Sequence, residues 1–196
     1  MATKTTYTVK YQRALQGKTD YKLRLRLLLS GATRCVIRRS LKNIIIQFVN
    51  YKPQGDEVIV SADSRMLAKY GWRGAGSNTS AAYLTGLLAA KRALPKVKNC
   101  ISDIGSASTV HGSVVFAALA GVLEGGLAIP ATKSVFPKEE RLLGKHTAAY
   151  AKQLKEKNLQ RYNKQFAQYL KNGLSPENLP EHVQTVKAKI LGEKHA

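Results

Sequence analysis

Residues 34–51, RCVIRRSLKNIIIQFVNY, hold the pattern that decides the fold. Two runs rich in β-branched residues, 34–39 and 43–50, are joined by the tripeptide SLK, and this spacing is typical of a β-hairpin. A third such run, EVIVSA at 57–62, follows the turn KPQGD, in which proline and glycine favour chain reversal. Together the three runs predict an antiparallel meander.

Beyond the meander the sequence alternates between helical and strand-like patterns. The expected elements are a short helix over 63–70, a long helix over 79–94, a strand over 99–104 and a helix over 113–124. Gly71 stops the first helix, Ser77 or Asn78 caps the long one, and Pro95 must end it. The fold class expected is therefore α/β, a mixed sheet of the meander plus one further strand, covered by helices.

The charge of the chain indicates a polyanionic partner. The sequence contains 32 Lys and Arg against 12 Asp and Glu, which gives a formal net charge of +20. A surplus of this size favours nucleic acid over a small ligand. Its distribution suggests three parts: a basic N-terminal arm with a short helix at 1–31, an α/β RNA-binding domain at 32–132 and a basic helical extension at 133–196. We expect little in the extension to bury a core of its own.

Other classes of protein find little support in the composition. No apolar run approaches the ~20 residues that span a bilayer, and the N-terminus lacks the apolar segment of a signal peptide, so we expect a cytoplasmic protein without membrane contact. Cys35 and Cys100 are too few and too far apart in sequence for a zinc site or a disulfide scaffold. Both lie in apolar stretches, and we expect buried, reduced thiols.

The stretch GKTDYKLRLRLLLSG, residues 17–31, alternates cations with leucines, which alone is typical of a half-buried strand. Its flanks favour a helix instead, because Thr19 or Asp20 is a good N-cap and Gly31 stands where a helix C-cap belongs. In a helix the leucines fall on two opposite sides with the cations between them. We expect one apolar face to dock on the protein body, which leaves the cationic flanks free for an acidic partner.

Residues 1–18 interleave Tyr7 and Tyr11 with Lys and Arg and show no sustained apolar period. A solvated tail is one interpretation of this pattern. The other is an arm that becomes ordered on RNA, with cations on phosphates and tyrosines stacked on bases. The sequence alone leaves both open.

Three further motifs have a chemical and a purely structural interpretation. The loop GSASTVHG, residues 105–112, resembles a phosphate cradle but lacks the P-loop Lys-Ser/Thr, so an ordinary turn is favoured. Asp63 and Asp103, each near a strand end, could hold Mg²⁺ as in a nuclease, although few other carboxylates are available to complete such a site. Trp72 and Arg73 could stack on RNA, or the tryptophan could close the core.

The four histidines lie in separate segments without a neighbouring cysteine. They are His111, His146, His182 and His195. Surface or capping roles are favoured over metal binding, and no metal or cofactor is expected.

Several blocks of the sequence resemble one known family. They are TDYKLRLRLLLSGATRCVIRRSLKNIIIQFV (19–49), GWRGAGSNTSAAYLTGLLAAKRAL (71–94), SDIG (102–105), HGSVVFAALAGVLEGGLAIP (111–130) and RLLGKHTAAYA (141–151). Together they resemble the archaeal-type large-subunit ribosomal protein eighteen family, whose eukaryotic relative is large-subunit protein five. The resemblance implies a structural, non-enzymatic protein that binds 5S rRNA and helps attach it to the large-subunit rRNA in the central protuberance.

The resemblance also implies partners and site residues. The partners would be 5S rRNA, large-subunit rRNA and neighbouring large-subunit ribosomal proteins, with no small-molecule substrate. The implied RNA-facing residues are Lys10, Tyr11, Arg13, Lys18, Tyr21, Arg24, Arg26, Arg34, Arg38, Arg39, Ser40, Lys42 and, as weaker candidates, Trp72, Arg73 and Asn78. The alternatives are a ribonuclease H-like metal-dependent nuclease and a general basic RNA chaperone.

Overall fold

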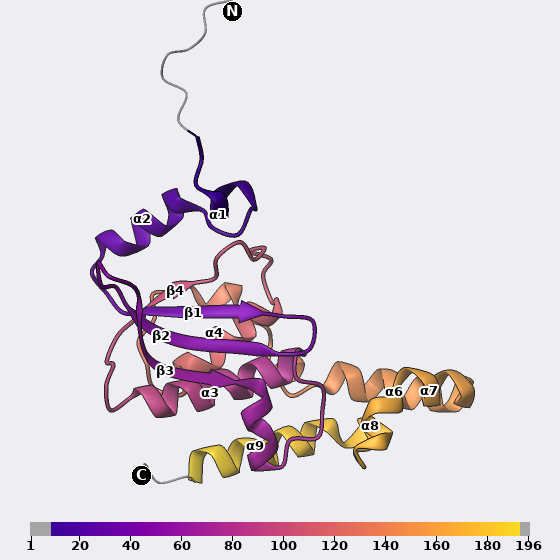
Figure 1. Cartoon of the computed structure of the whole chain (residues 1–196). Coiled ribbons are helices and arrows are strands. Elements are labelled where there is room, and N and C mark those ends of the chain that lie inside the picture. Colours follow the sequence, from indigo (N-terminus) through magenta and orange to yellow (C-terminus); the bar gives the residue numbers. More distant parts are fainter. Residues whose placement is uncertain (1–8, 193–196) are drawn as a thin grey trace, which may run out of the picture.

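The computed structural model describes residues 9–192 of the chain. A four-stranded sheet forms its centre, with the strands in the order β3-β2-β1-β4 (Figure 1). The strands are β1 (Arg34–Arg39), β2 (Ile44–Asn50), β3 (Glu57–Asp63) and β4 (Ile101–Asp103). Strands β1, β2 and β3 pair antiparallel in chain order, whereas β4 runs parallel to β1. The predicted meander with one further strand is confirmed.

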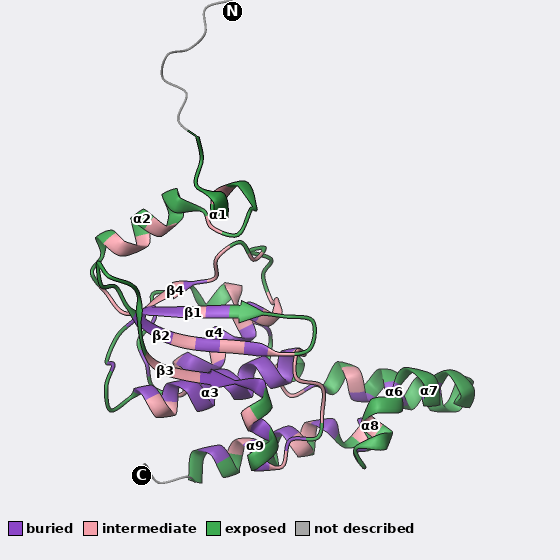
Figure 2. Ribbon diagram, viewed as in Figure 1, coloured by how far each residue is buried: buried purple, intermediate pink, exposed green. Residues whose placement is uncertain are grey.

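One face of the sheet carries the hydrophobic core. Cys35, Ile37, Ile46 and Phe48 are buried there because alternate residues of a strand point to the same side. Two helices, α3 (Thr79–Ala93) and α4 (Val114–Glu124), pack against this face, and Figure 2 shows α3 buried along most of its length. Val36 and Gln47 lie on the opposite face and are only half-buried.

The two core helices approach each other closely at two glycines. A Cβ atom on Gly86 would lie 2.1 Å from the carbonyl oxygen of Ala118, and one on Gly121 would lie 2.1 Å from that of Tyr83. No side chain fits at either position without moving a backbone. The close packing of α3 on α4 therefore depends on these two glycines.

Local signals in the sequence fix the ends of several helices. Asp63 caps the 3₁₀ helix η1 (Ser64–Tyr70) by accepting a hydrogen bond from the backbone N–H of Arg65. Gly71 ends η1 with a φ of 87°, a conformation that favours glycine. The Asn78 side chain accepts from the N–H of Ala81 and so caps α3, which ends before Pro95 as predicted.

The C-terminal third is helical, as expected. Its elements are η2 (Lys133–Val135), α5 (Glu139–Leu142), α6 (Lys145–Lys157), α7 (Leu159–Gln165), α8 (Ala167–Lys171), η3 (Pro176–Asn178) and α9 (Leu179–Gly192). Helix α9 joins the main core, where Val183, Val186 and Ile190 are buried.

Helices α6 and α7 project beyond the end of the sheet (Figure 1). Together with Phe166, at the junction of α7 and α8, they enclose a small hydrophobic cluster of their own, formed by Ala151, Leu154, Tyr162 and Phe166. The expectation that this region buries no core of its own is therefore wrong. Its apolar residues lie on both sides of Asn158, the N-cap of α7, and the packing of α7 against α6 brings them together.

Both cysteines are free and buried, as predicted. A hydrogen bond with the Cys100 thiol and burial together raise the pKa of Cys35 well above its ordinary value, so this thiol stays protonated. Within residues 9–192, none of the helices has the length and apolar content to cross a bilayer.

Candidate nucleic-acid interface

The basic stretch at 17–31 forms a helix, as its flanks predict. Helix α2 (Tyr21–Leu29) begins at Asp20, whose carboxylate accepts from the backbone N–H of Lys22 at 2.9 Å and of Leu23 at 3.1 Å. None of the residues of α2 is buried, and Leu29 is 78% exposed. The expectation that its leucines dock on the protein body is therefore wrong. Leucines on two opposite sides provide no single apolar face wide enough to pack on the domain.

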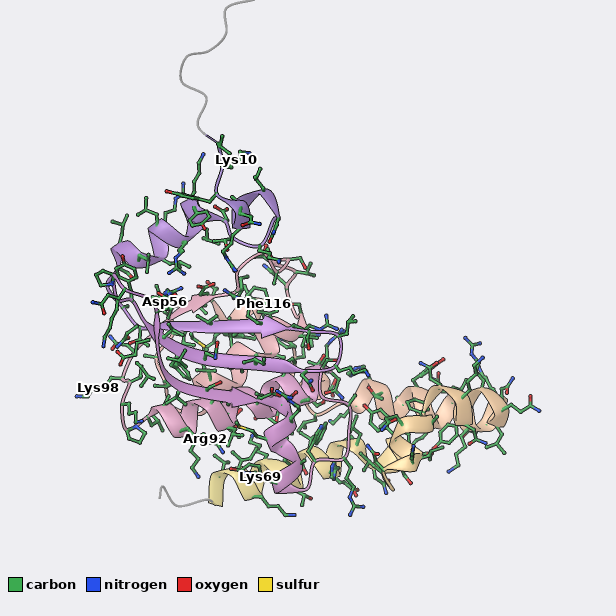
Figure 3. The ribbon with its side chains drawn as sticks, in the orientation of Figure 1. Lys10, Asp56, Lys69, Arg92, Lys98 and Phe116 are labelled. Atoms are coloured by element: carbon green, nitrogen blue, oxygen red, sulfur yellow. The ribbon has the colours of Figure 1, made fainter. Side chains whose placement is uncertain are left out.

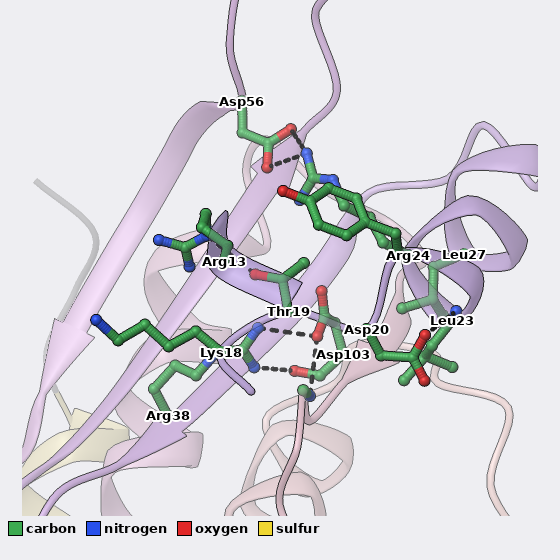
Figure 4. Close-up of a pocket in the computed structure, with 12 residues that line it drawn as sticks. Arg13, Lys18, Thr19, Asp20, Leu23, Arg24, Leu27, Arg38, Asp56 and Asp103 are labelled. Carbon is green, nitrogen blue, oxygen red and sulfur yellow. Dashed lines mark hydrogen bonds and ion pairs between the residues drawn. The ribbon is translucent and has the colours of Figure 1, made fainter. Parts of the chain in front are cut away.

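Helix α2 instead stands over the edge of the sheet (Figure 1). The side chains between the helix and the sheet line a groove (Figure 4). This cavity, the arm groove, has a volume of about 510 Å³ and lies between α2, the preceding loop and the ends of β1 and β4. The cations that line the arm groove are Arg13, Lys18, Arg24 and Arg38, and its carboxylates are Asp20, Asp56 and Asp103. The structure therefore brings together cations that are up to 25 positions apart in sequence.

A chain of ion pairs runs along the floor of the arm groove. Arg24 donates to both carboxylate oxygens of Asp56 at 2.9 Å, and Arg34 donates to Asp56 at 2.6 Å. Arg34 also donates to Asp103 at 2.9 Å, and Arg38 reaches the other oxygen of Asp103 at 3.0 Å. The order of this ion-pair chain is Arg24, Asp56, Arg34, Asp103 and Arg38.

The members of the ion-pair chain differ in how far their side chains are buried. The Arg34 side chain is only 3% exposed, whereas those of Arg24 and Arg38 are 34% and 49% exposed. Burial alone would raise the pKa of Asp56, but hydrogen bonds from Arg34 and Arg24 outweigh it and lower that pKa. Asp56 is therefore ionised at neutral pH and links α2 to the sheet.

The N-terminal arm continues the cationic surface. Helix α1 (Gln12–Leu15) precedes α2, and the rings of Tyr11 and Tyr21 lie 5.0 Å apart, which joins the two segments. The guanidinium of Arg13 donates to the hydroxyl of Thr19 at 3.0 Å. Lys10 lies at the far end of the described arm (Figure 3). Tyr7, one of the tyrosines that the arm interpretation would stack on bases, lies outside the described residues.

The tip of the β1–β2 hairpin is a tight, exposed turn. The Ser40 hydroxyl donates to the carbonyl of Asn43 at 2.9 Å and accepts from the Asn43 N–H at 3.0 Å. Leu41 is 97% exposed, and Arg39 and Lys42 on either side are exposed as well. The turn thus presents two cations to solvent.

The glycine-rich loop lies elsewhere and contacts the C-terminal helices. Trp72 is buried and stacks on His182, with ring centroids 5.2 Å apart. The backbone N–H of Arg73 donates to the same imidazole at 3.2 Å, and the Asn78 amide donates to the hydroxyl of Tyr169 at 3.1 Å. The structure therefore does not bring Trp72, Arg73 and Asn78 together with the arm groove.

The two carboxylates of the nuclease alternative are far apart in the sheet. Asp63 ends β3 and Asp103 ends β4, and these strands form opposite edges. Asp63 is paired with Arg65 at 2.6 Å, and Asp103 is paired with two arginines of the ion-pair chain. Two carboxylates so placed cannot share a metal ion, and the nuclease alternative loses its basis.

The role of Asp56 is only weakly indicated by the amino-acid sequence. It lies in the turn between β2 and β3 and looks like an ordinary turn residue, yet it holds two arginines. The one available signal was its rarity, because the basic N-terminal 52 residues contain a single acid, Asp20, and the next acid is Asp56.

Fold and charge together define a basic α/β protein of the class that binds RNA. A family model described as ribosomal large subunit proteins 60S L5 and 50S L18 matches residues 5–100. The chain belongs to this family and is a large-subunit ribosomal protein. The family implies ribosomal RNA and other ribosomal proteins as partners.

Proposed function

We propose that this protein binds 5S rRNA through the arm groove and its surroundings, and helps attach it to the large-subunit rRNA in the central protuberance. The role is structural, and no reaction is assigned to it. Family membership supports the ribosomal part of this proposal. The charges around the arm groove support the choice of surface.

One observation carries the choice of surface: α2 buries none of its residues. A helix with no fully buried residue gains little stability from its own domain, because short helices in water are marginal. Its N-cap and its link to Asp56 keep it in place, with Lys22 and Arg26 exposed. Such a helix is suited to gain its remaining contacts from a polyanion.

The proposed contact surface joins the arm, α2 and the hairpin tip. Its members are Lys10, Tyr11, Arg13, Lys18, Tyr21, Lys22, Arg24, Arg26, Arg38, Ser40 and Lys42. Arg39 is left out because it points to the other face of the sheet and lines a different cavity. Arg34 and Trp72 are left out because both are buried, and we assign Arg34 a positioning role within the ion-pair chain. Arg73 and Asn78 are left out because they bind the C-terminal helices.

Competition between 5S rRNA and an unrelated RNA of equal length tests the function. We expect 5S rRNA to displace the unrelated RNA at concentrations at least about tenfold lower, since specific sites exceed non-specific ones by far more than this. Equal competition would favour the general RNA chaperone and refute the proposal. Magnesium-dependent cleavage of either RNA would refute the non-enzymatic role.

The salt dependence of binding tests the proposed surface. Lys18, Arg26 and Lys42 are exposed and form no ion pair within residues 9–192. If each neutralises one phosphate, the variant K18Q/R26Q/K42Q should make the slope of log affinity against log salt shallower by about 2 to 3. The control K152Q/K157Q/K171Q removes the same charge from exposed positions on α6 and α8 and should leave the slope nearly unchanged. Equal changes in the two variants would mean that binding follows total charge alone.

A further variant separates the paired arginines from the free cations. Arg24 and Arg38 already face carboxylates, so fewer counterions are released when RNA binds them. The double variant R24Q/R38Q should therefore change the salt slope by less than about 1, although two charges are removed. A change of about 2 would show that both arginines leave their carboxylates when RNA binds.

A further inference from the structure

Two neighbouring arginines of β1 point to opposite faces of the sheet. In the register of β1 with β2, Arg38 lies opposite Ile45 and Arg39 opposite Ile44. Arg38 lines the arm groove, whereas Arg39 lines a second and larger cavity of about 900 Å³. We call this second cavity the rear groove. It involves no residue of the arm or of α2.

The rear groove is built from segments that are distant in sequence. Its walls are the loop that leads into α4, the segment around η2, helix α5 and the first turns of α6. The N–H of Gly112 donates to the carbonyl of Val135 at 2.9 Å, which joins the two loops. A backbone hydrogen bond therefore helps to fix the shape of the rear groove, which is not determined by flexible side chains alone.

The rim of the rear groove is cationic. Its charged residues are Arg39, Lys138, Arg141, Lys145 and Glu140. Glu140 approaches Lys145 at 3.6 Å, and both are exposed, so this pair is weak. Among the described residues Arg39, Lys138 and Arg141 have no acidic partner within ion-pair distance. Three cations therefore remain available to an anion.

The interior of the rear groove combines apolar and polar groups. Phe136 and Pro137 provide an apolar surface, and the imidazole of His146 lines the groove beside them. Ser113 stands at the N-terminus of α4, and within the described part of the chain its hydroxyl is buried without a hydrogen-bond partner. A bound molecule with a hydrogen-bonding group near Ser113 would give the buried hydroxyl a partner. A flat apolar ring on the same molecule could pack on Phe136.

We propose that the rear groove binds an unpaired segment of RNA, separate from the RNA held at the arm groove. Its phosphates would lie on the cationic rim, and a base would stack on Phe136. A cavity of this volume has the size of a small-molecule site, so it accepts single nucleotides and excludes a duplex. The inference rests on the proposed function and deepens it. Two RNA sites on opposite sides of β1 give one protein the means to join two RNA segments.

Binding of a fluorescent oligouridylate to the protein saturated with 5S rRNA tests this inference. Wild-type protein should form a ternary complex. The variant K138Q/R141Q/K145Q should weaken oligouridylate binding at least about tenfold and make its salt slope shallower by about 2, with single-strand counterion release as the guide. Its affinity for 5S rRNA should change by less than about twofold.

The matched control is again K152Q/K157Q/K171Q, which removes the same charge from α6 and α8 outside the rear groove. It should leave oligouridylate binding nearly unchanged, and equal weakening by the two variants would refute the site. Displacement of oligouridylate by 5S rRNA would also refute it, because the two RNAs would then share one surface. Oligoglutamate that binds as tightly and with the same dependence on Lys138, Arg141 and Lys145 would show that the groove holds an acidic protein segment.

The failure of this inference is distinguishable from the failure of the proposed function. If 5S rRNA has no advantage over unrelated RNA, the proposed function is wrong. If 5S rRNA binds with preference but K138Q/R141Q/K145Q leaves oligouridylate binding unchanged, the proposed function stands and the rear groove is not an RNA site.

Discussion

Replacing Asp103 by Asn should destabilise the fold far more than the same change at Asp63. The Asp103 side chain is 8% exposed and accepts from Arg34 at 2.9 Å, from Arg38 at 3.0 Å and from the N–H of Gly105 at 3.1 Å. Asparagine keeps the shape but removes the charge, so the buried Arg34 retains only Asp56 as its counterion. Loss of one partner of a buried ion pair costs about 3 kcal/mol.

Asp63 provides the matched comparison. Its main structural contribution is the cap of η1, and asparagine caps a helix about as well as aspartate. Its partner Arg65 is exposed on the surface, where an ion pair adds little. The variant D63N should therefore remain close to the wild type in stability.

Thermal unfolding followed by circular dichroism measures the difference. For a chain of this length, about 3 kcal/mol lowers the Tm by about 6 to 12 °C. We expect that loss for D103N and a change below about 2 °C for D63N. The double variant R34M/D103L should recover part of the loss, because a buried apolar pair needs no counterion. Equal Tm values for D103N and D63N would refute the structural role assigned to Asp103.

Three other outcomes are expected from other parts of the structure. Deletion of residues 1–18 should leave the Tm nearly unchanged, because α1 buries no residue, while it weakens 5S rRNA binding at least about tenfold; a large loss of Tm would make the arm structural. The pKa of Asp56 is lowered by its two arginine partners against the effect of burial, so its contribution to stability is present at neutral pH and is lost as the pH falls below about 4. D56N should accordingly reduce the acid-induced drop in Tm, and an unchanged drop would contradict this. G86A should lower the Tm by about 5 °C or more, because its Cβ would overlap the carbonyl of Ala118, and a normal Tm would show that the helices can separate without cost.

The elements that the sequence predicts well are those with local signals. Strand β1 has the predicted bounds, and α3 begins after the predicted cap Asn78. Helix α2 begins at Asp20 despite its strand-like alternation, because capping and helix propensity act within a few residues. In each case the residues that determine where the element begins or ends lie close together in the chain.

The features that the sequence does not predict depend on distant residues. Arg34 looks like one more exposed cation of a basic strand, yet it is buried because Asp56 and Asp103 come to it from 22 and 69 positions away. Trp72 is likewise covered by His182 from the last helix. Neither residue has a neighbour in the chain that indicates these partners. Arg34 is therefore expected on the RNA surface, and the sequence leaves Trp72 between stacking on RNA and closing the core, of which the structure shows the second.

The placement of α2 shows a related limit. Its leucines suggested a docked helix, but the contact that holds it to the sheet is electrostatic, through Arg24 and Asp56. Hydrophobic periodicity detects a face that can be buried and does not reveal whether another element lies opposite it. In α2, Leu23 and Leu27 face the arm groove, and none of the leucines is buried.

Under the proposed function, the ion-pair chain also determines how the free energy of RNA binding is divided among the cations. A phosphate that approaches Arg24 or Arg38 must compete with Asp56 or Asp103, so exchange of one anion for another yields little net gain. The buried Arg34 cannot move toward RNA without giving up its ion pairs with both Asp56 and Asp103. Under the proposed function Arg24 and Arg38, at the two ends of the ion-pair chain, fix where the RNA backbone lies, while the affinity comes from cations without internal partners. This division is the reason that R24Q/R38Q should alter the position or specificity of bound RNA more than the salt dependence of its affinity.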